Sequence, residues 1–333
     1  MKPTPSVLFA LTLLAVTRVI AADISPACVS VNRQAQALLA ENRVTEAQTQ
    51  LSQFSAQLDA AISGSNSNPN SDNDKLCLGV TLHNLSSALE DLGQLDAADE
   101  AISRSIRLLE EIVGPTAPEI RRPLQLAASI AIQKGQRNRA ATLLARAELL
   151  EAHSRSDIAM TTTLRGRLLM QAGKLTDAEC AYRQALSERE LAGQGASPFI
   201  QTALSGLAIV YLKQGRAAEA LPLLERSLKI SELFPAQSES HTTALFNLAI
   251  AYSAHHEEKP AASCFRLAID SLSNLPAASR PNAGRIVYLA YAKFLQQNGR
   301  KREANALVEE ERGLFGPDPA IYTVGLEALR AGR

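Results

Sequence analysis

The apolar positions between residues 201 and 232 follow a helical period that is interrupted once. Large apolar side chains recur at steps of three and four residues on both sides of the interruption, at Leu204, Leu207, Tyr211, Leu221, Leu224 and Leu228. The interruption contains Gly215, a residue that adopts a positive φ without a side-chain clash. Small residues at Ala208 and Ala220 would let two helices approach closely. The pattern predicts a hairpin of two antiparallel helices.

The same spacing of small, apolar, Gly and Ala positions occurs seven times along the chain. The small residue of the first helix falls at Ala35, Ser86, Ala128, Gly166, Ala208, Ala249 and Ala292. Twelve residues later stands an alanine in every copy, at Ala47, Ala98, Ala140, Ala178, Ala220, Ala261 and Ala304. We call these fourteen positions the pivots. Predicted hairpins cover 28–62, 76–113, 120–152, 158–192, 199–233, 240–273 and 283–314.

This pattern resembles the tetratricopeptide repeat. The repeats are longer than the usual length of about 34 residues, and the link at residues 114–119 resembles the Gly-Pro link of kinesin light chain-type repeats. The resemblance covers roughly residues 28 to 330. It implies an all-α fold, a right-handed α-solenoid of about seven hairpins, and it carries over no catalytic residue.

The turn inside each hairpin predicts a residue with positive φ. Five copies have glycine there, whereas the first has Asn42 and the sixth has His256, which is the least suitable of the three residue types. Capping boxes at Thr45–Gln48 and Thr176–Glu179, together with Asp96 as a cap, are expected to begin three of the second helices.

Three segments fall outside the repeats. The first residues have the layout of a signal peptide, with an apolar run at 7–16 and cleavage expected after Ala21 or Ala22. The alternative, a transmembrane anchor, needs about 20 apolar residues, and Arg18 interrupts the run too early. Residues 64–75 are polar and are expected to form a mobile loop. A final helix over 318–331 is expected to cap the stack.

Composition narrows the classes of partner. The chain of 333 residues has 34 Lys plus Arg and 34 Asp plus Glu, so it has no overall field that attracts nucleic acid or an anionic membrane. Trp is absent and aromatic residues make up 4%, which disfavours platforms for single-stranded nucleic acid. We therefore expect neither nucleic-acid binding nor membrane insertion after signal cleavage.

The cysteines and histidines suggest little chemistry. Cys28 and Cys77 fall near the starts of adjacent first helices, where a disulfide is possible in an exported protein and free thiols are the alternative. Cys180 and Cys264 are expected to be buried free thiols. His255 and His256 are adjacent at a helix end and lack metal-binding spacing. No catalytic motif, metal site or cofactor site is expected.

In the architecture that the resemblance implies, first-helix residues beside the pivots face a concave groove. Positions in the second and third repeats include His83, Glu90, Gln125, Ser129 and Gln133. The residues we select as partner contacts are Asn84, Arg167, Lys213, Phe246, Asn247, Ile250 and Lys293. Asn84 and Asn247 stand where many such repeats use Asn to bind a ligand backbone.

The leading hypothesis is an exported scaffold, periplasmic or secreted, without catalytic activity. It would bind an extended peptide or a partner helix in its groove. The alternative from another class is a structural assembly protein that forms homo-oligomers through its ends or its convex face. An enzyme or metal sensor using His255 and His256 ranks third.

Overall fold

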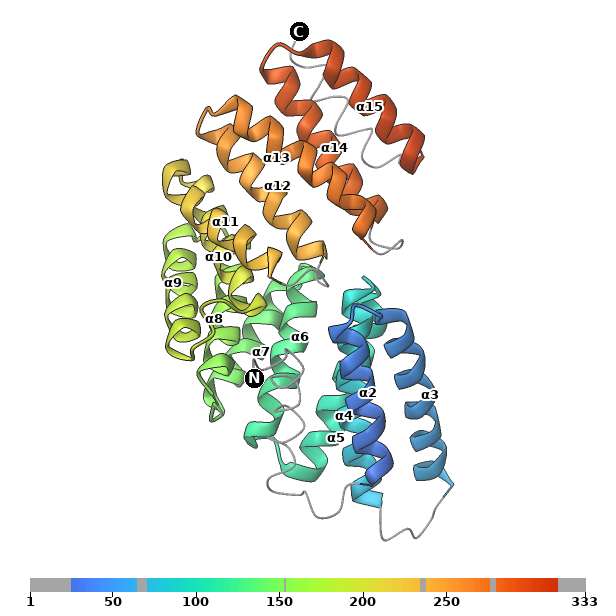
Figure 1. Cartoon of the computed structure of the whole chain (residues 1–333). Helices are drawn as coiled ribbons and strands as arrows, with labels where there is room; N and C mark the ends of the chain where they lie inside the picture. The colour runs from blue at the N-terminus through green and yellow to red at the C-terminus, as the bar shows by residue number, and fades with distance from the viewer. Residues whose placement is uncertain (1–24, 65–70, 153, 234–237, 276–279, 317–333) are drawn as a thin grey trace. The chain divides into compact units, whose positions relative to one another are not determined.

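The computed structural model describes residues 25–64, 71–152, 154–233, 238–275 and 280–316. Within these ranges the chain forms fourteen α-helices, two short 3-10 helices and no strand (Figure 1). This confirms the all-α fold class. The α-helices are α2 (Pro26–Ala40), α3 (Val44–Ser63), α4 (Ser71–Asp91), α5 (Leu95–Val113), α6 (Arg121–Gln133), α7 (Arg137–Leu149), α8 (Arg155–Gln171), α9 (Leu175–Leu191), α10 (Pro198–Lys213), α11 (Ala217–Glu232), α12 (Ser238–Ala254), α13 (Glu258–Ser271), α14 (Arg280–Gln297) and α15 (Lys301–Phe315).

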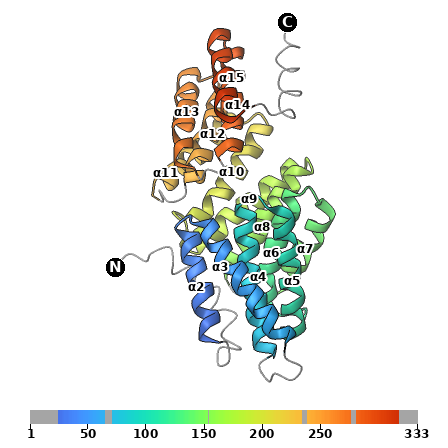
Figure 2. The ribbon, with the colours of Figure 1, turned by 90° about the vertical axis from the view of Figure 1, so that its right-hand side faces the viewer.

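These helices form two compact units, one ending at Gly195 and the other beginning at Ala196. The first contains four consecutive hairpins, α2–α3 to α8–α9, and the second contains three, α10–α11 to α14–α15 (Figures 1 and 2). Within the first unit α4 packs on α2 and α6, and α6 also packs on α8; within the second, α10 packs on α12. In these repeats the first helices are therefore direct neighbours.

The fourteen pivots are all buried. Nearly all have no exposed surface, and Ala292 and Ala304 are only 2% and 5% exposed. Ser86 is the one polar pivot, and its hydroxyl donates to the backbone carbonyl of Ala98, the other pivot of the same hairpin, at 2.8 Å. The buried hydroxyl is therefore satisfied, and the serine serves as a close-contact residue like the alanines.

Each hairpin turns at a residue in the left-handed region, as predicted. The φ values are 61° at Asn42 and 64° at His256, and between 71° and 76° at the five glycines. In all seven turns the next residue donates its N–H to the carbonyl five positions earlier, as Gln94 does to Leu89 at 2.9 Å. This bond satisfies a carbonyl at the end of the first helix.

The predicted capping boxes are wrong. The residue that follows the left-handed position is already the N-cap, so α3, α5 and α9 begin after Arg43, Gln94 and Lys174, without a side-chain cap. Thr45, Asp96 and Thr176 consequently fall inside the first turn. Only three residues lie between the two helices of each of these hairpins, so the second helix begins directly after the left-handed residue and its successor.

The expected segments between and beyond the repeats are only partly described. Helix α4 begins at Ser71, so residues 71–75 of the expected loop are helical. Residues 65–70, the signal peptide at 1–22 and the capping helix at 318–331 lie outside the described residues.

Candidate functional site

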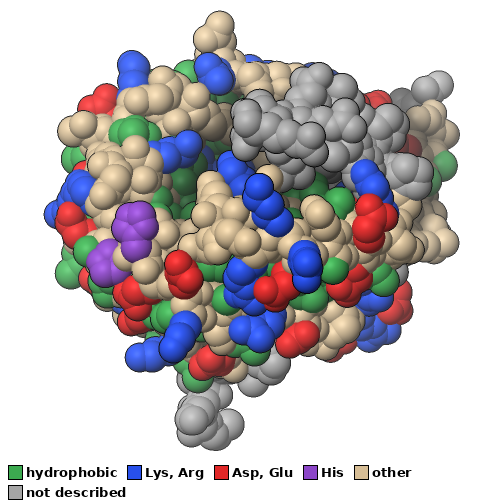
Figure 3. Space-filling model, turned by 90° about the horizontal axis from the view of Figure 1, so that it is seen from above, with side chains coloured by type: hydrophobic (Ala, Val, Ile, Leu, Met, Phe, Trp, Pro, Cys, Tyr) green, Lys and Arg blue, Asp and Glu red, His purple; other side chains and the backbone are tan. Residues whose placement is uncertain are grey.

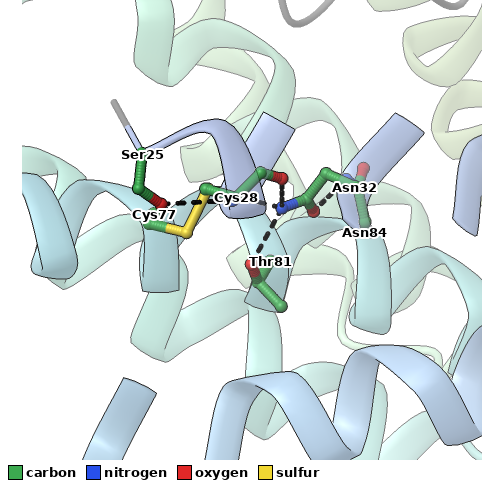
Figure 4. Close-up of a disulfide and its surroundings, with 6 residues drawn as sticks. All are labelled: Ser25, Cys28, Asn32, Cys77, Thr81 and Asn84. Carbon is green, nitrogen blue, oxygen red and sulfur yellow. Dashed lines mark hydrogen bonds between the residues drawn. A yellow bond between two sulfur atoms is a disulfide. The ribbon is translucent and has the colours of Figure 1, made fainter. Parts of the chain in front are cut away.

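Cys28 on α2 and Cys77 on α4 form a disulfide, with an S–S distance of 2.11 Å and Cα atoms 6.0 Å apart (Figure 4). Both cysteines are 2% exposed. The side chain of Ser25 accepts a hydrogen bond from the N–H of Cys28 and so caps α2. The disulfide resolves the alternative that the sequence left open, and it joins the first hairpin to the second.

Asn84 lies in the interior beside this disulfide and not on a binding surface. It is 6% exposed, and its amide donates to Oδ1 of Asn32 at 2.8 Å (Figure 4). Asn32 in turn donates to the hydroxyl of Thr81 and to the carbonyl of Cys28, both at 3.0 Å. Asn84 thus links α2 to α4, and a partner would reach it only by displacing α2. Residues 84–86, Asn-Leu-Ser, have the form of an N-glycosylation acceptor, but Asn84 and Ser86 are buried and so are not accessible to a glycosylating enzyme.

A row of four polar side chains crosses the first helices of the second, third and fourth repeats. The row consists of Glu90 on α4, Ser129 and Gln133 on α6, and Arg167 on α8, and we call it the polar row. Oε1 of Glu90 accepts hydrogen bonds from the Ser129 hydroxyl, at 2.6 Å, and from the Gln133 amide. All four residues stand at positions that the repeat pattern predicts for the groove.

The charges of the polar row are unusual because they are held partly out of water. Burial raises the pKa of Glu90, and this effect is opposed by the Ser129 hydrogen bond and by the nearby charge of Arg167. Arg167 is half-buried and makes no hydrogen bond or ion pair with any residue that the structure describes. The row therefore holds a carboxylate and a guanidinium that influence each other without being paired.

A second set of polar contacts joins α6 to α8 near their N-termini. Nε of Arg122 donates to Oδ1 of Asp157 at 3.0 Å, and the Gln125 amide donates to the Asp157 carbonyl at 2.8 Å. Asp157 is 3% exposed and forms a capping pair with Ser154 at the start of α8. The sequence reasoning missed Arg122 and Asp157, although the pattern Ser-x-x-Asp at 154–157 was a readable signal.

His83 lies on α4, and the charge of Arg122 on α6 acts on it. Its Nδ1 is buried and has no hydrogen-bond partner among the described residues. Burial, assisted by the charge of Arg122, lowers the pKa of His83 to about 4. The side chain is therefore neutral at physiological pH.

The other predicted contacts belong to the second unit. Lys213 on α10 and Lys293 on α14 are exposed, whereas Asn247 and Ile250 on α12 are half-buried. Phe246 is half-buried because its ring meets Phe265 edge-on, at 6.3 Å between ring centroids. That contact gives Phe246 a packing role of its own. Its apolar character is therefore not an independent sign of a partner.

The remaining candidate chemistry is sparse. Within the described ranges no group of three His, Cys, Asp or Glu side chains is arranged to hold a metal ion. His255 bonds to Glu257 in an exposed turn. Cys264 is buried as expected, but Cys180 is exposed, because it stands two residues from both Ala178 and Tyr182, which face the core.

One face of the molecule carries mixed charge. Acidic and basic side chains are interspersed on the face that Figure 3 shows. None of the described helices combines the length and the apolar character that a membrane crossing requires.

Family models of the tetratricopeptide repeat match two parts of the chain. One match covers residues 199–274, which contain α10 to α13, and the other covers residues 78–119, which contain most of α4 and all of α5. No curated protein sequence gives a significant match.

Solved structures resemble the chain over most of its length at low identity. The apo form of the quorum sensor NprR from B. thuringiensis has a TM-score of 0.64 at 16% identity, over 93% of this chain and 86% of that chain. A Rap protein complexed with Competence and Sporulation Factor has a TM-score of 0.60 at 12% identity, over 86% and 74%. BtubC (BKLC) from P. vanneervenii has a TM-score of 0.54 at 18% identity, over 68% and 94%. At these identities the likeness concerns the fold.

Proposed function

This chain is a tetratricopeptide-repeat protein, and on this premise we propose that it is a non-catalytic scaffold that binds an extended peptide or a partner helix along its first helices. Repeat proteins of this kind generally present stacked first helices as an extended binding surface. The observation that carries the proposal is the polar row. Its side chains come from three successive repeats, and its charges are left unpaired by the protein itself.

Two further observations support the proposal. The structural neighbour in the Rap family is complexed with Competence and Sporulation Factor, so the shared fold accommodates a ligand in that protein. In the second unit, Lys213 and Lys293 are exposed on the first helices α10 and α14, and Asn247 and Ile250 are half-buried on the first helix α12. These four side chains offer two charges, an amide and an apolar contact to a partner.

Site-directed photocrosslinking tests which helices meet the partner. A photoreactive amino acid such as benzoylphenylalanine would replace Gln171 or Lys213, which are exposed first-helix positions, and in matched controls Arg107 or Arg137, which are exposed on second helices. Irradiation in the native cell is expected to crosslink partners from the first-helix positions and not from the controls. Crosslinks that form only from the controls would contradict groove binding.

The alternative, assembly through the ends or the convex face, predicts a different outcome of the same experiment. Crosslinks would then join copies of this chain, and they would arise from second-helix positions. Light scattering over a concentration series provides the independent check, because a monomer at all concentrations excludes self-assembly.

We also propose that the protein is exported to the periplasm or secreted. The sequence at residues 1–22 and the buried disulfide support this proposal, because disulfides persist mainly in oxidising compartments. Fractionation of cells, followed by mass determination of the mature chain, tests it. A cytosolic chain that retains residues 1–22 and has free Cys28 and Cys77 would refute it.

A further inference from the structure

Only one of the two carboxylate oxygens of Glu90 accepts hydrogen bonds within the described parts of the chain. Both of its hydrogen bonds end on Oε1, from Ser129 and Gln133. Oε2 accepts no hydrogen bond from any described residue and is not fully buried, so it keeps some contact with solvent. Because α6 supplies both donors, the carboxylate is fixed in orientation, with one oxygen left available for an incoming donor.

Arg167 offers the complementary group on the other side of α6. Its guanidinium is half-buried on α8, has no partner in the described parts of the chain, and lies near enough for its charge to act on Glu90. A guanidinium presents several N–H donors and no acceptor. The polar row therefore presents an acceptor from α4 and donors from α8, separated by one helix.

The two charges together decide which ligand groups fit between them. An ammonium or guanidinium at Oε2 of Glu90 would also face the like charge of Arg167, and a carboxylate at Arg167 would also face Glu90, so part of the attraction of either charged group would be cancelled. A neutral group that carries an N–H donor beside a C=O acceptor satisfies both residues without adding a like charge. The amide has this arrangement, in a peptide bond and in the side chains of Asn and Gln.

Resting on the proposed function, we propose that Glu90 and Arg167 together bind an amide group of an extended peptide, with Glu90 Oε2 accepting from its N–H and Arg167 donating to its C=O. Ser129 and Gln133 are positioning residues, because they hold the Glu90 carboxylate. The amide belongs either to an Asn or Gln side chain of the ligand or to its backbone.

A synthetic peptide library tests the proposal with the full chain and its disulfide intact. The probe is a set of immobilised 12-residue peptides whose positions vary among Ala, Leu, Ser, Asn, Gln, Lys and Asp. A side-chain amide predicts enrichment of Asn or Gln over Leu, Lys and Asp by about tenfold at one position. A backbone amide predicts instead that N-methylation of one peptide bond weakens binding by a similar factor.

Matched variants assign the effect to the two residues. Glu90→Gln removes the accepting Oε2 and Arg167→Gln removes the guanidinium, and each is expected to abolish the amide preference or the effect of N-methylation. Glu100→Gln and Arg107→Gln make the same changes at exposed positions of α5 and should leave both effects unchanged. Unaltered circular dichroism and thermal midpoints would show that the variants fold.

The outcomes of these experiments distinguish failure of the amide-recognition proposal from failure of the proposed scaffold function. Peptides that bind through Lys or Asp at the selected position, or an amide preference that survives in both Glu90→Gln and Arg167→Gln, would overturn amide recognition while leaving the peptide scaffold intact. Failure of any peptide to bind, together with crosslinks confined to second helices, would overturn the proposed function and this inference with it.

Discussion

Gly166 on α8 and Tyr182 on α9 are in direct contact at the pivot of the fourth hairpin. A Cβ added to Gly166 would lie 3.0 Å from the Tyr182 ring carbons Cε1 and Cζ. Tyr182 has no exposed surface, and in the hairpins of the first unit the equivalent position otherwise holds Leu or Ile. In this hairpin the Tyr182 ring occupies the space that a Cβ at residue 166 would need.

Replacing Gly166 by Ala is expected to destabilise the protein. Overpacking against Tyr182 costs about 1–3 kcal/mol, which exceeds the gain of about 1 kcal/mol in helix propensity. Denaturant unfolding measures the difference. The double variant with Tyr182→Leu should recover part of the loss, and the control Gly313→Ala, where a Cβ meets nothing within 4 Å, should be stabilising or neutral. Equal effects at Gly166 and Gly313 would contradict the proposed clash.

Removing the hydroxyl of Tyr182 is expected to increase the stability of the protein. This oxygen is buried and has no hydrogen-bond partner among the described residues, and burial raises its pKa. Removing an unsatisfied buried polar group stabilises by about 1 kcal/mol. Tyr182→Phe is therefore expected to raise the free energy of unfolding, and a loss of stability would mean that the hydroxyl has a partner.

His256 occupies a turn position that five other repeats fill with glycine. Its φ of 64° is unfavourable for a residue with a Cβ. His256→Gly is expected to increase the free energy of unfolding by about 1 kcal/mol. The reciprocal change Gly215→Ala, at a φ of 75°, should decrease it by at least as much. Changes of the same sign in the two variants would exclude backbone strain as the cause.

The disulfide is expected to stabilise the first hairpin. It links residues separated by 49 positions, a loop for which the entropy model gives about 4 kcal/mol. Cys28→Ser with Cys77→Ser should lower stability by this amount and should speed hydrogen exchange in α2 and α3 more than in α14 and α15. Cys180→Ser, at an exposed free thiol, is the control and should have no effect.

His83 predicts a loss of stability in mild acid. Its pKa falls from about 6.5 in the unfolded chain to about 4 in the fold, so the unfolded chain binds the proton first. Stability is therefore fully present above pH 6.5 and declines as the pH falls to about 4, by up to about 3 kcal/mol. NMR titration of the imidazole should give a midpoint near 4. In His83→Gln this part of the pH dependence should disappear, and a midpoint near 6.5 would contradict the burial effect.

Positions fixed by the repeat itself could be predicted from the sequence. The buried pivots and the seven left-handed turn residues follow from spacing, because close helix contact requires a small side chain and a tight reversal requires a positive φ. The spacing predicts a positive φ at Asn42 and His256 even though neither residue is glycine. The residue spacing within one repeat is therefore enough to predict those positions whose backbone geometry is the same in every repeat.

Contacts between repeats could not be predicted in the same way. Asn84 stands at a groove position of its own hairpin, but α2 covers it, because the disulfide and Asn32 hold α2 against α4. Likewise Arg122 and Asp157 meet only because α6 packs on α8. Such contacts depend on the side chains of the neighbouring repeat, which the periodicity of one repeat does not contain.

The disulfide between α2 and α4 also makes the first two hairpins respond differently from the others when the chain is unfolded by a pulling force. Each hairpin in a unit is held chiefly by its neighbours in sequence, so a threading motor that pulled from Phe315 toward lower residue numbers would release hairpins through non-covalent rupture alone until it reached Cys77. At Cys77 the motor would reach the loop that the Cys28–Cys77 disulfide closes. Mechanical unfolding does not break this bond, so translocation would pause until a thiol reduced it.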